Sequence, residues 1–330
     1  MKENMSFREM LGQRLFISVE GTEITDELRM LITEYKCGNI VLFQPNIVSF
    51  EQTKRLCREI QELVTRELGE SALIAIDQEG GGVTRLSEDF VNVPGAMALA
   101  ATGDGQAVYD ASAVTAHELR AAGVNFNFAP VADISCDPDN PVIGVRSFGE
   151  TPEAVSRYAV RAYQGFEDGH IASSAKHFPG HGDTHTDSHL SLPSIDKTLE
   201  ELESFEFRPF EALIRAGCPA VMTAHIVYPQ IEKKMIPATM SRLFLTDILR
   251  GRMGFDGLIL TDSLEMNAIR RVYGAGRGAV AAIQAGCDML LTGKGAEIII
   301  EEINAVEAAA ARGEIDMDEM AASLRRIEAV

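Results

Sequence analysis

Four of the seven histidines lie between residues 177 and 189, directly after an apolar run. Their four-residue spacing would line one face of a helix, as in helical zinc sites, but Pro179 and the glycines beside it make a continuous helix improbable. We therefore expect a loop. Within it, the Asp187 carboxylate can accept a hydrogen bond from one ring nitrogen of His189 and leave the other free for acid–base catalysis. The alternative is a solvated loop whose histidines have no catalytic role. The density of histidines directly after a strand disfavours this alternative.

Three further charged residues stand where functional side chains are common. Asp262 follows an apolar run without other charges, which suits a carboxylate nucleophile or a metal ligand, although it could also cap a following helix. Asp77 precedes glycines that form either a phosphate cradle or a tight turn, and the cradle lacks the lysine and serine of a P-loop. Arg146, flanked by glycines and an aromatic residue, is either a rigid ligand-binding group or part of a surface salt bridge.

The elements that must position these residues alternate along the chain. Eight short apolar runs have the length of buried parallel strands: Arg14–Val19, Asn39–Phe43, Ala72–Asp77, Val124–Ala129, Ile171–Lys176, Ala220–Ala224, Leu258–Asp262 and Asp288–Thr292. A stretch of helical periodicity follows each of them: Thr25–Tyr35, Phe50–Leu68, Gly105–Ala122, Thr151–Glu167, Lys197–Ala216, Ser241–Arg252, Leu264–Ala285 and Gly293–Arg312. Residues 317–330 add a closing helix.

This alternation predicts an α/β fold, a (β/α)₈ TIM-type barrel. A doubly wound sheet would usually have fewer strands and a glycine-rich fingerprint after the first. No linker rich in proline, glycine or serine divides the chain. We therefore expect a single catalytic barrel domain over residues 1–330, without a second domain.

In such a barrel, active-site groups gather at the C-terminal ends of the strands. In the sequence, the third predicted strand ends in Asp77, the fifth in Lys176 and His177, the sixth in His225 and the seventh in Asp262. Burying ionisable groups against apolar strands is costly unless they have a partner or a function. The barrel therefore predicts that these side chains converge on one site.

The composition favours a small neutral ligand. A formal net charge of −19 and a sequence pI of about 4.8 disfavour nucleic acid, anionic membranes and polyanionic substrates as ligands.

The five cysteines are widely spaced and form no C-x-x-C pair, so we expect buried free thiols in a reducing compartment, without disulfides or a cysteine-rich zinc site. The N-terminus has no apolar signal-peptide region and no window has the length of a membrane span, which predicts a soluble cytoplasmic protein.

Several sequence blocks together resemble one enzyme family. They are Ile76-Asp77-Gln78-Glu79-Gly80-Gly81 followed by Arg85, then Ile143 to Gly149, Lys176 to Asp183, Asp187-Ser188-His189, and Gly257 to Asp262. Their order closely resembles the β-N-acetylglucosaminidases of glycoside hydrolase family 3, of the peptidoglycan-recycling type. The resemblance implies a retaining exo-glycosidase, a β-N-acetylhexosaminidase that hydrolyses terminal β-linked N-acetylglucosamine.

The resemblance also implies a role for each site residue. Asp262 would be the nucleophile that forms a covalent glycosyl-enzyme, and His189, oriented by Asp187, would be the general acid and then the base. His181 would shape the loop. Five residues would bind sugar hydroxyls: Asp77, Arg85, Arg146, Lys176 and His177. The resemblance implies no metal, no cofactor and a small carbohydrate as the partner, and the sequence leaves the oligomeric state open.

Departures and alternatives accompany this interpretation. Gly82 and Ser263 stand where many family members carry an arginine and a second aspartate, and no chemistry is assigned to either. The chain has no tryptophan, the commonest stacking platform for long glycans, which favours a small exo-acting pocket.

Two alternative functions lie within the family: a β-glucosidase, and a phosphorylase in which phosphate replaces water. A metal-dependent amidohydrolase is disfavoured because the first strand carries no histidine pair, and a silent sugar-binding protein would not need the catalytic residues.

Overall fold

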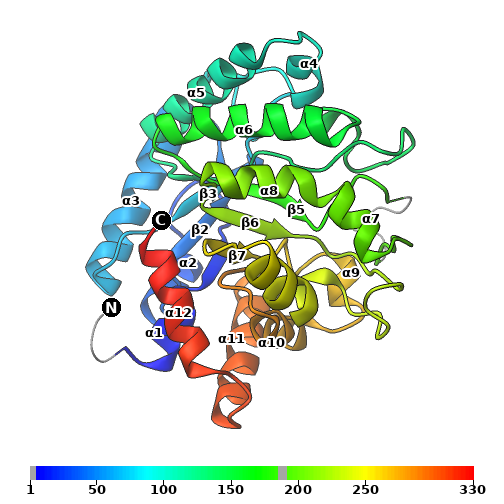
Figure 1. Ribbon diagram of the computed structural model, residues 1–330. Coiled ribbons are helices and arrows are strands. Elements are labelled where there is room, and N and C mark those ends of the chain that lie inside the picture. Colours follow the sequence, from blue (N-terminus) through cyan, green and yellow to red (C-terminus); the bar gives the residue numbers. More distant parts are fainter. Residues whose placement is uncertain (1–4, 185–191) are drawn as a thin grey trace.

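The computed structural model describes residues 5–184 and 192–330 of the chain (Figure 1). Eight parallel strands follow one another in sequence order: β1 (Leu15–Ser18), β2 (Asn39–Leu42), β3 (Ile74–Ile76), β4 (Phe126–Asn127), β5 (Ala172–Phe178), β6 (Ala220–Thr223), β7 (Leu258–Leu260) and β8 (Leu290–Leu291). β1 pairs with both β2 and β8, and a parallel bridge between Leu260 and Met289 joins the two ends of the sheet. The predicted TIM-type barrel, with all eight strands, is confirmed.

Helices cover the outside of the barrel (Figure 1). They are α1 (Phe7–Gly12), α2 (Asp26–Thr33), α3 (Phe50–Leu68), α4 (Ala96–Ala100), α5 (Gly105–Ala121), α6 (Pro152–Asp168), α7 (Leu199–Ser204), α8 (Phe207–Ala216), α9 (Asn267–Arg270), α10 (Ala275–Ala285), α11 (Ala296–Ala311) and α12 (Met317–Glu328). Four further helical segments are the short 3₁₀-helices η1 (Gln44–Asn46), η2 (Gly144–Arg146) and η3 (Ala238–Met240), and the longer η4 (Leu243–Arg252). The sequence did not predict α1 and α4, which are too short to show a clear helical period, whereas α12 is the expected closing helix.

Two predicted helices are each divided in the structure. Lys197–Ala216 forms α7 and α8, because Phe205 leaves the helical region at φ −131° and ψ −76°. Leu264–Ala285 forms α9 and α10, because the chain passes through Gly274 at φ 76° and ψ 159°, a conformation that residues with a Cβ rarely adopt. The helix predicted over Ser241–Arg252 is present as η4, a wider π-helix with hydrogen bonds between residues five apart.

Apolar side chains fill the barrel interior. Phe16, Phe126 and Phe128 meet edge to face, with ring centroids 5.4 to 5.6 Å apart. Met222 and Leu258 belong to the same buried cluster, and a larger apolar cluster includes the helices around the strands. The barrel is thus a packed core rather than a pore, and a ligand must bind at one of its ends.

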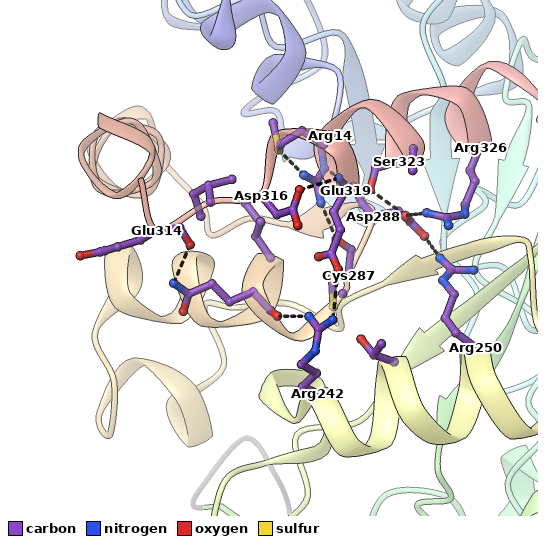
Figure 2. Close-up of a pocket in the computed structure, with 17 residues that line it drawn as sticks. Arg14, Arg242, Arg250, Cys287, Asp288, Glu314, Asp316, Glu319, Ser323 and Arg326 are labelled. Atoms are coloured by element: carbon purple, nitrogen blue, oxygen red, sulfur yellow. Dashed lines mark hydrogen bonds and ion pairs between the residues drawn. The ribbon is translucent and has the colours of Figure 1, made fainter. Parts of the chain in front are cut away.

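A buried ionic cluster fastens α12 to the N-terminal end of the barrel (Figure 2). The Asp288 carboxylate, which is fully buried, accepts hydrogen bonds from Arg250, Ser323 and Arg326. Arg14 is also buried and donates to the backbone oxygen of Asp288 at 2.7 Å. These residues border an open space of about 1040 Å³. Arg14, Arg250 and Arg326 each donate hydrogen bonds to groups of the protein itself, so we assign the cluster a structural role.

Among residues 5–184 and 192–330, no helix is long and apolar enough to span a membrane. All five cysteines are free thiols, and four of them are buried, which agrees with the expectation from their spacing.

Candidate active site

The C-terminal ends of the strands surround a pocket of about 740 Å³, measured with its open mouth. Six predicted site residues line it: Asp77, Arg85, Arg146, Lys176, His177 and Asp262. Its other lining residues are Glu79, Val83, Val142, His181, Met222, Met266 and Leu291. His225 does not line the pocket, but its Nε2 lies 2.9 Å from the backbone oxygen of Ser263, the residue after Asp262. The predicted convergence of the strand ends is therefore observed.

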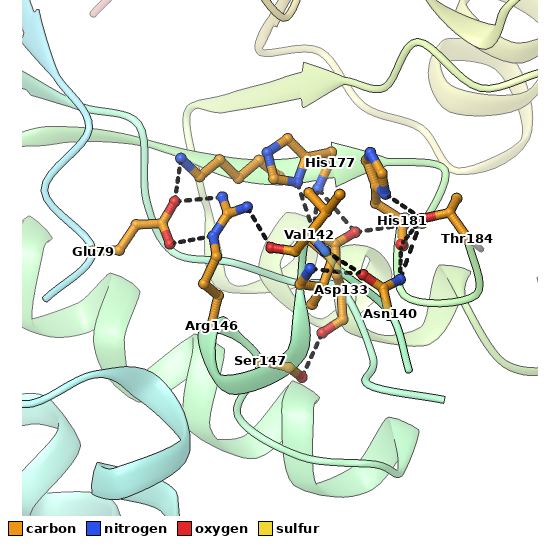
Figure 3. Close-up of polar contacts among 12 residues, drawn as sticks. Glu79, Asp133, Asn140, Val142, Arg146, Ser147, His177, His181 and Thr184 are labelled. Atoms are coloured by element: carbon orange, nitrogen blue, oxygen red, sulfur yellow. Dashed lines mark hydrogen bonds and ion pairs between the residues drawn. The ribbon is translucent and has the colours of Figure 1, made fainter. Parts of the chain in front are cut away.

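Carboxylates and cations alternate along one wall of this pocket. Lys176 Nζ lies 2.7 Å from Asp77 Oδ1 and 2.6 Å from Glu79 Oε1. Arg146 donates two hydrogen bonds to Glu79, of 2.8 Å from Nε and 2.7 Å from Nη2 (Figure 3). Arg85 Nη2 is 3.8 Å from the other oxygen of Asp77. Each charge on this wall therefore has a partner of opposite sign, which fixes the position of its side chain.

Burial and ion pairing shift the pKa values of these groups in opposite directions. Burial alone would raise the pKa of Glu79, but the neighbouring charges of Lys176 and Arg146 lower it to about 2. Burial alone would lower the pKa of Lys176, but Asp77 and Glu79 raise it above its ordinary value. Glu79 and Lys176 therefore stay charged at neutral pH. Such fixed charges suit sugar hydroxyls, which donate to carboxylates and accept from cations.

Asp133, which follows β4, holds the segment that begins at His177. It is 1% exposed, and its Oδ2 lies 2.7 Å from Nδ1 of His177 (Figure 3). The backbone N–H groups of His177 and His181 donate to the same carboxylate at 3.1 and 2.7 Å. Burial would raise the pKa of Asp133, but the charge and hydrogen bonds of His177 lower it. The ring and the backbone of His177 are thus fixed by one buried anion.

Asp262 lies just beyond β7 on the wall of the pocket. The next helix begins only at Asn267, so Asp262 does not cap it. Its Oδ1 accepts a hydrogen bond of 2.7 Å from the backbone N–H of Ser263. Burial would raise the pKa of Asp262, but the charges of His177 and His225 lower it below its ordinary value. An ionised carboxylate facing a ligand pocket can act as a nucleophile.

The histidine-rich loop is described up to Thr184. His181 is buried, its Nδ1 lies 2.9 Å from Thr184 Oγ1, and burial lowers its pKa to about 4, an environment that agrees with a part in shaping the loop. Lys197 Nζ contacts Asp183 at 2.8 Å and Glu206 at 2.5 Å. An ion pair thus joins the chain before and after residues 185–191. The predicted acid–base residues Asp187 and His189 lie outside the described residues.

Residues 6–330 match the Glycosyl hydrolase family 3 N terminal domain. The chain belongs to glycoside hydrolase family 3. Among its family 3 relatives, a beta-hexosaminidase of Neisseria meningitidis serogroup C is 40% identical over 275 residues, which cover 81% of this chain and 74% of the relative. Beta-hexosaminidase A of Pseudoalteromonas piscicida is 37% identical over 287 residues, or 82% of this chain, but these cover only 48% of that longer protein.

Solved structures of the family agree with the barrel. A glycoside hydrolase family 3 beta-N-acetylglucosaminidase from Paenibacillus sp. str. FPU-7 has a TM-score of 0.97 and 43% identity, covering 99% of this chain and 62% of that one. A beta-N-acetylhexosaminidase from Beutenbergia cavernae has a TM-score of 0.91 and 30% identity, covering 99% of this chain and 98% of that one. Membership in a glycoside hydrolase family, expected from the sequence blocks, is confirmed.

Two residues of this family 3 site were not assigned a role from the sequence. Glu79 stands two positions after Asp77 at the same strand end, a spacing that places side chains on one side of an extended chain. Asp133 interrupts the apolar run 131–134 beyond the fourth predicted strand. Both satisfy the criterion that selected Asp77 and Lys176, because each places a charge against an apolar strand end.

Proposed function

We propose that this family 3 domain is a retaining exo-β-N-acetylglucosaminidase, which removes terminal β-linked N-acetylglucosamine. The observation that carries the proposal is that Asp262 shares one pocket with all five residues expected to bind sugar hydroxyls. The choice of sugar is supported by relatives named beta-hexosaminidase and beta-N-acetylglucosaminidase. The space of about 740 Å³ is in the range of small-ligand pockets, which supports recognition of a single terminal sugar.

The proposed reaction has two steps. In the first, an oxygen of Asp262 attacks the anomeric carbon while the glycosidic bond breaks, and protonated His189 donates its proton to the departing oxygen. In the second, neutral His189 takes a proton from water, whose oxygen attacks the anomeric carbon and displaces Asp262. Asp187 accepts the hydrogen bond that keeps the His189 ring in its reactive tautomer. Two inversions at one carbon retain the β configuration.

The natural substrate that we propose is a peptidoglycan fragment with N-acetylglucosamine at its non-reducing end. The net charge of −19 disfavours a polyanionic chain and leaves a short fragment acceptable. Five free thiols support a reducing, cytoplasmic location. Incubation with short cell-wall oligosaccharides should release one free N-acetylglucosamine from the non-reducing end of each fragment, detected by mass spectrometry.

The test of the activity uses two chromogenic substrates. The protein should release nitrophenol from 4-nitrophenyl β-N-acetylglucosaminide with a kcat/KM at least about tenfold above that for the β-glucoside, a difference of about 1.4 kcal/mol in the transition state. Proton NMR during the first turnovers should show the β anomer of the free sugar before mutarotation. A preference for the glucoside would favour the β-glucosidase alternative, and an initial α anomer would exclude retention.

Inorganic phosphate separates hydrolysis from phosphorolysis. If water is the acceptor, the sole sugar product should be free N-acetylglucosamine at any phosphate concentration. Glycosyl phosphate, formed at a rate that rises with phosphate, would identify a phosphorylase instead. The measurement is ³¹P NMR of the product mixture with and without phosphate.

His189→Ala should slow the reaction most where protonation of the leaving group matters most. We expect kcat/KM to fall about 10²- to 10⁴-fold for a glycoside of an alkyl alcohol, and much less for the nitrophenyl glycoside, whose leaving group needs no acid. His117→Ala, on the exposed face of α5, is the control and should leave both rates unchanged. Equal losses on the two substrates would contradict the acid role of His189.

A further inference from the structure

Asp133 receives hydrogen bonds from one short segment and does not line the pocket. Its carboxylate accepts from Nδ1 and the backbone N–H of His177 and from the backbone N–H of His181. Its side chain is fully buried. It therefore has no exposed surface for a substrate, and any effect on the reaction must pass through the groups that it holds.

The contact with Asp133 decides which ring nitrogen of His177 carries a hydrogen. An ionised carboxylate only accepts hydrogen bonds, so Nδ1 must donate to Oδ2 across the 2.7 Å contact. The low pKa of Asp133 supports its ionised state. In neutral His177, Nε2 is then the bare nitrogen, and protonation of the ring adds the second hydrogen there. His177 lines the pocket, so its charge is felt at the site of reaction.

His177 contacts the buried carboxylate of Asp133 and lines the same pocket as Asp262. The positive charge of His177 is the leading influence that lowers the pKa of Asp262 against the effect of burial. Asp133 has the sign that stabilises this charge on the ring. Other charged or titratable groups face His177 and Asp262 from several elements. They are Asp77 and Glu79 after β3, Arg85 in the loop that follows, Arg146 in η2, Lys176 in β5, His181 after β5, and His225 after β6.

We propose that Asp133 is a positioning residue that acts through His177 on Asp262: it fixes the Nδ1–H tautomer, stabilises the imidazolium, and so keeps the nucleophile ionised. The proposal rests on the proposed function where it concerns catalysis. The assignment of the His177 tautomer does not depend on the proposed function, because the tautomer is a property of the folded protein without substrate.

Asp133→Asn tests the proposal through the pH profile. The variant keeps the size of the side chain but removes the charge, so a proton on His177 is less stabilised and Asp262 is protonated at higher pH. Since Asp262 must be ionised to attack, the acid limb of kcat/KM should move up by about one pH unit, and kcat/KM near pH 7 should fall roughly 100-fold. A loss of rate with an unmoved acid limb would mean a merely structural role and would overturn the proposal.

A double-mutant cycle asks whether the effect passes through His177. In the His177→Ala background, Asp133→Asn should cause no further shift of the acid limb. The same shift in both backgrounds would overturn the proposal. Asp139→Asn removes one charge from an exposed position of the same loop and should leave the limb where it is in the wild type.

A measurement on the wild-type protein keeps the proposal testable if Asp133→Asn does not fold. In protein labelled with ¹⁵N-histidine, the resonances of His177, assigned by comparison with His177→Ala, should show a hydrogen on Nδ1 and none on Nε2 when the ring is neutral. A bare Nδ1 would overturn the proposal. If wild-type protein does not turn over the chromogenic glycoside, the proposed function fails, whereas the NMR result still decides the tautomer.

Discussion

Replacing Asp262 by asparagine should lower kcat for 4-nitrophenyl β-N-acetylglucosaminide by about 10⁴-fold or more. The amide oxygen can still accept the hydrogen bond from Ser263, so the local backbone should be unchanged. The amide lacks the negative charge and the nucleophilic oxygen that would attack the anomeric carbon. KM should change far less than kcat, because the charged wall of Lys176 and Arg146 is intact.

Asp262→Ala adds a stereochemical test of the same assignment. The shorter side chain leaves room for azide on the face from which Asp262 would attack, so added azide should partly restore turnover and yield an α-configured glycosyl azide. Asp256→Asn, at an exposed position just before β7, is the matched control and should keep full activity. An undiminished kcat in Asp262→Asn, or a β-configured azide from Asp262→Ala, would contradict the nucleophile assignment.

The barrel was predictable because its signals are local. Each strand is a short apolar run and each long helix carries its own end signals, as in α3, where Ser49 caps the first turn and Gly69 at φ 73° ends the last. The bounds predicted for α3 match those observed. In contrast, the breaks at Phe205 and Gly274 interrupt stretches of good helical periodicity, so the periodicity alone did not reveal them.

The convergence of the site followed from the barrel rather than from any single motif. Asp77 and Lys176 are 99 residues apart in sequence, yet parallel strands place both at the same end of the barrel, where they form a 2.7 Å ion pair. What the sequence could not supply was the pairing itself. Asp133 bonds His177 across 44 positions, and nothing local in either segment identifies the partner.

A similar limit applies at the other end of the barrel. The apolar run that begins at Arg14 predicts a strand, but it does not reveal that Arg14 is buried and bonded to the backbone of Asp288, 274 positions away. Charged residues at the N-terminal end of a barrel are expected to serve stability rather than catalysis. The cluster around Asp288 can therefore be tested by unfolding, separately from activity.

Replacing Asp288 by alanine should lower the free energy of unfolding by about 3–5 kcal/mol, because it leaves buried donors without their acceptor. The carboxylate accepts from Arg250 and from the backbone N–H of Ile259 on one oxygen, and from Ser323 and Arg326 on the other. These donors belong to η4, β7 and α12, so one deletion uncouples three elements. Urea denaturation of the full chain measures the change.

The matched control is Glu319→Ala, which removes an exposed carboxylate of α12 that borders the same open space as Asp288. Glu319 pairs with Arg242 at 3.3 Å, with 43% of its side chain exposed, so water and salt already screen the pair. Its loss should cost no more than about 1 kcal/mol. Below its unfolding transition, Asp288→Ala should hydrolyse the chromogenic substrate as wild type does, because the pocket lies at the opposite end of the barrel. Similar, small losses of stability in both variants would show that burial of the Asp288 cluster is not what fastens α12.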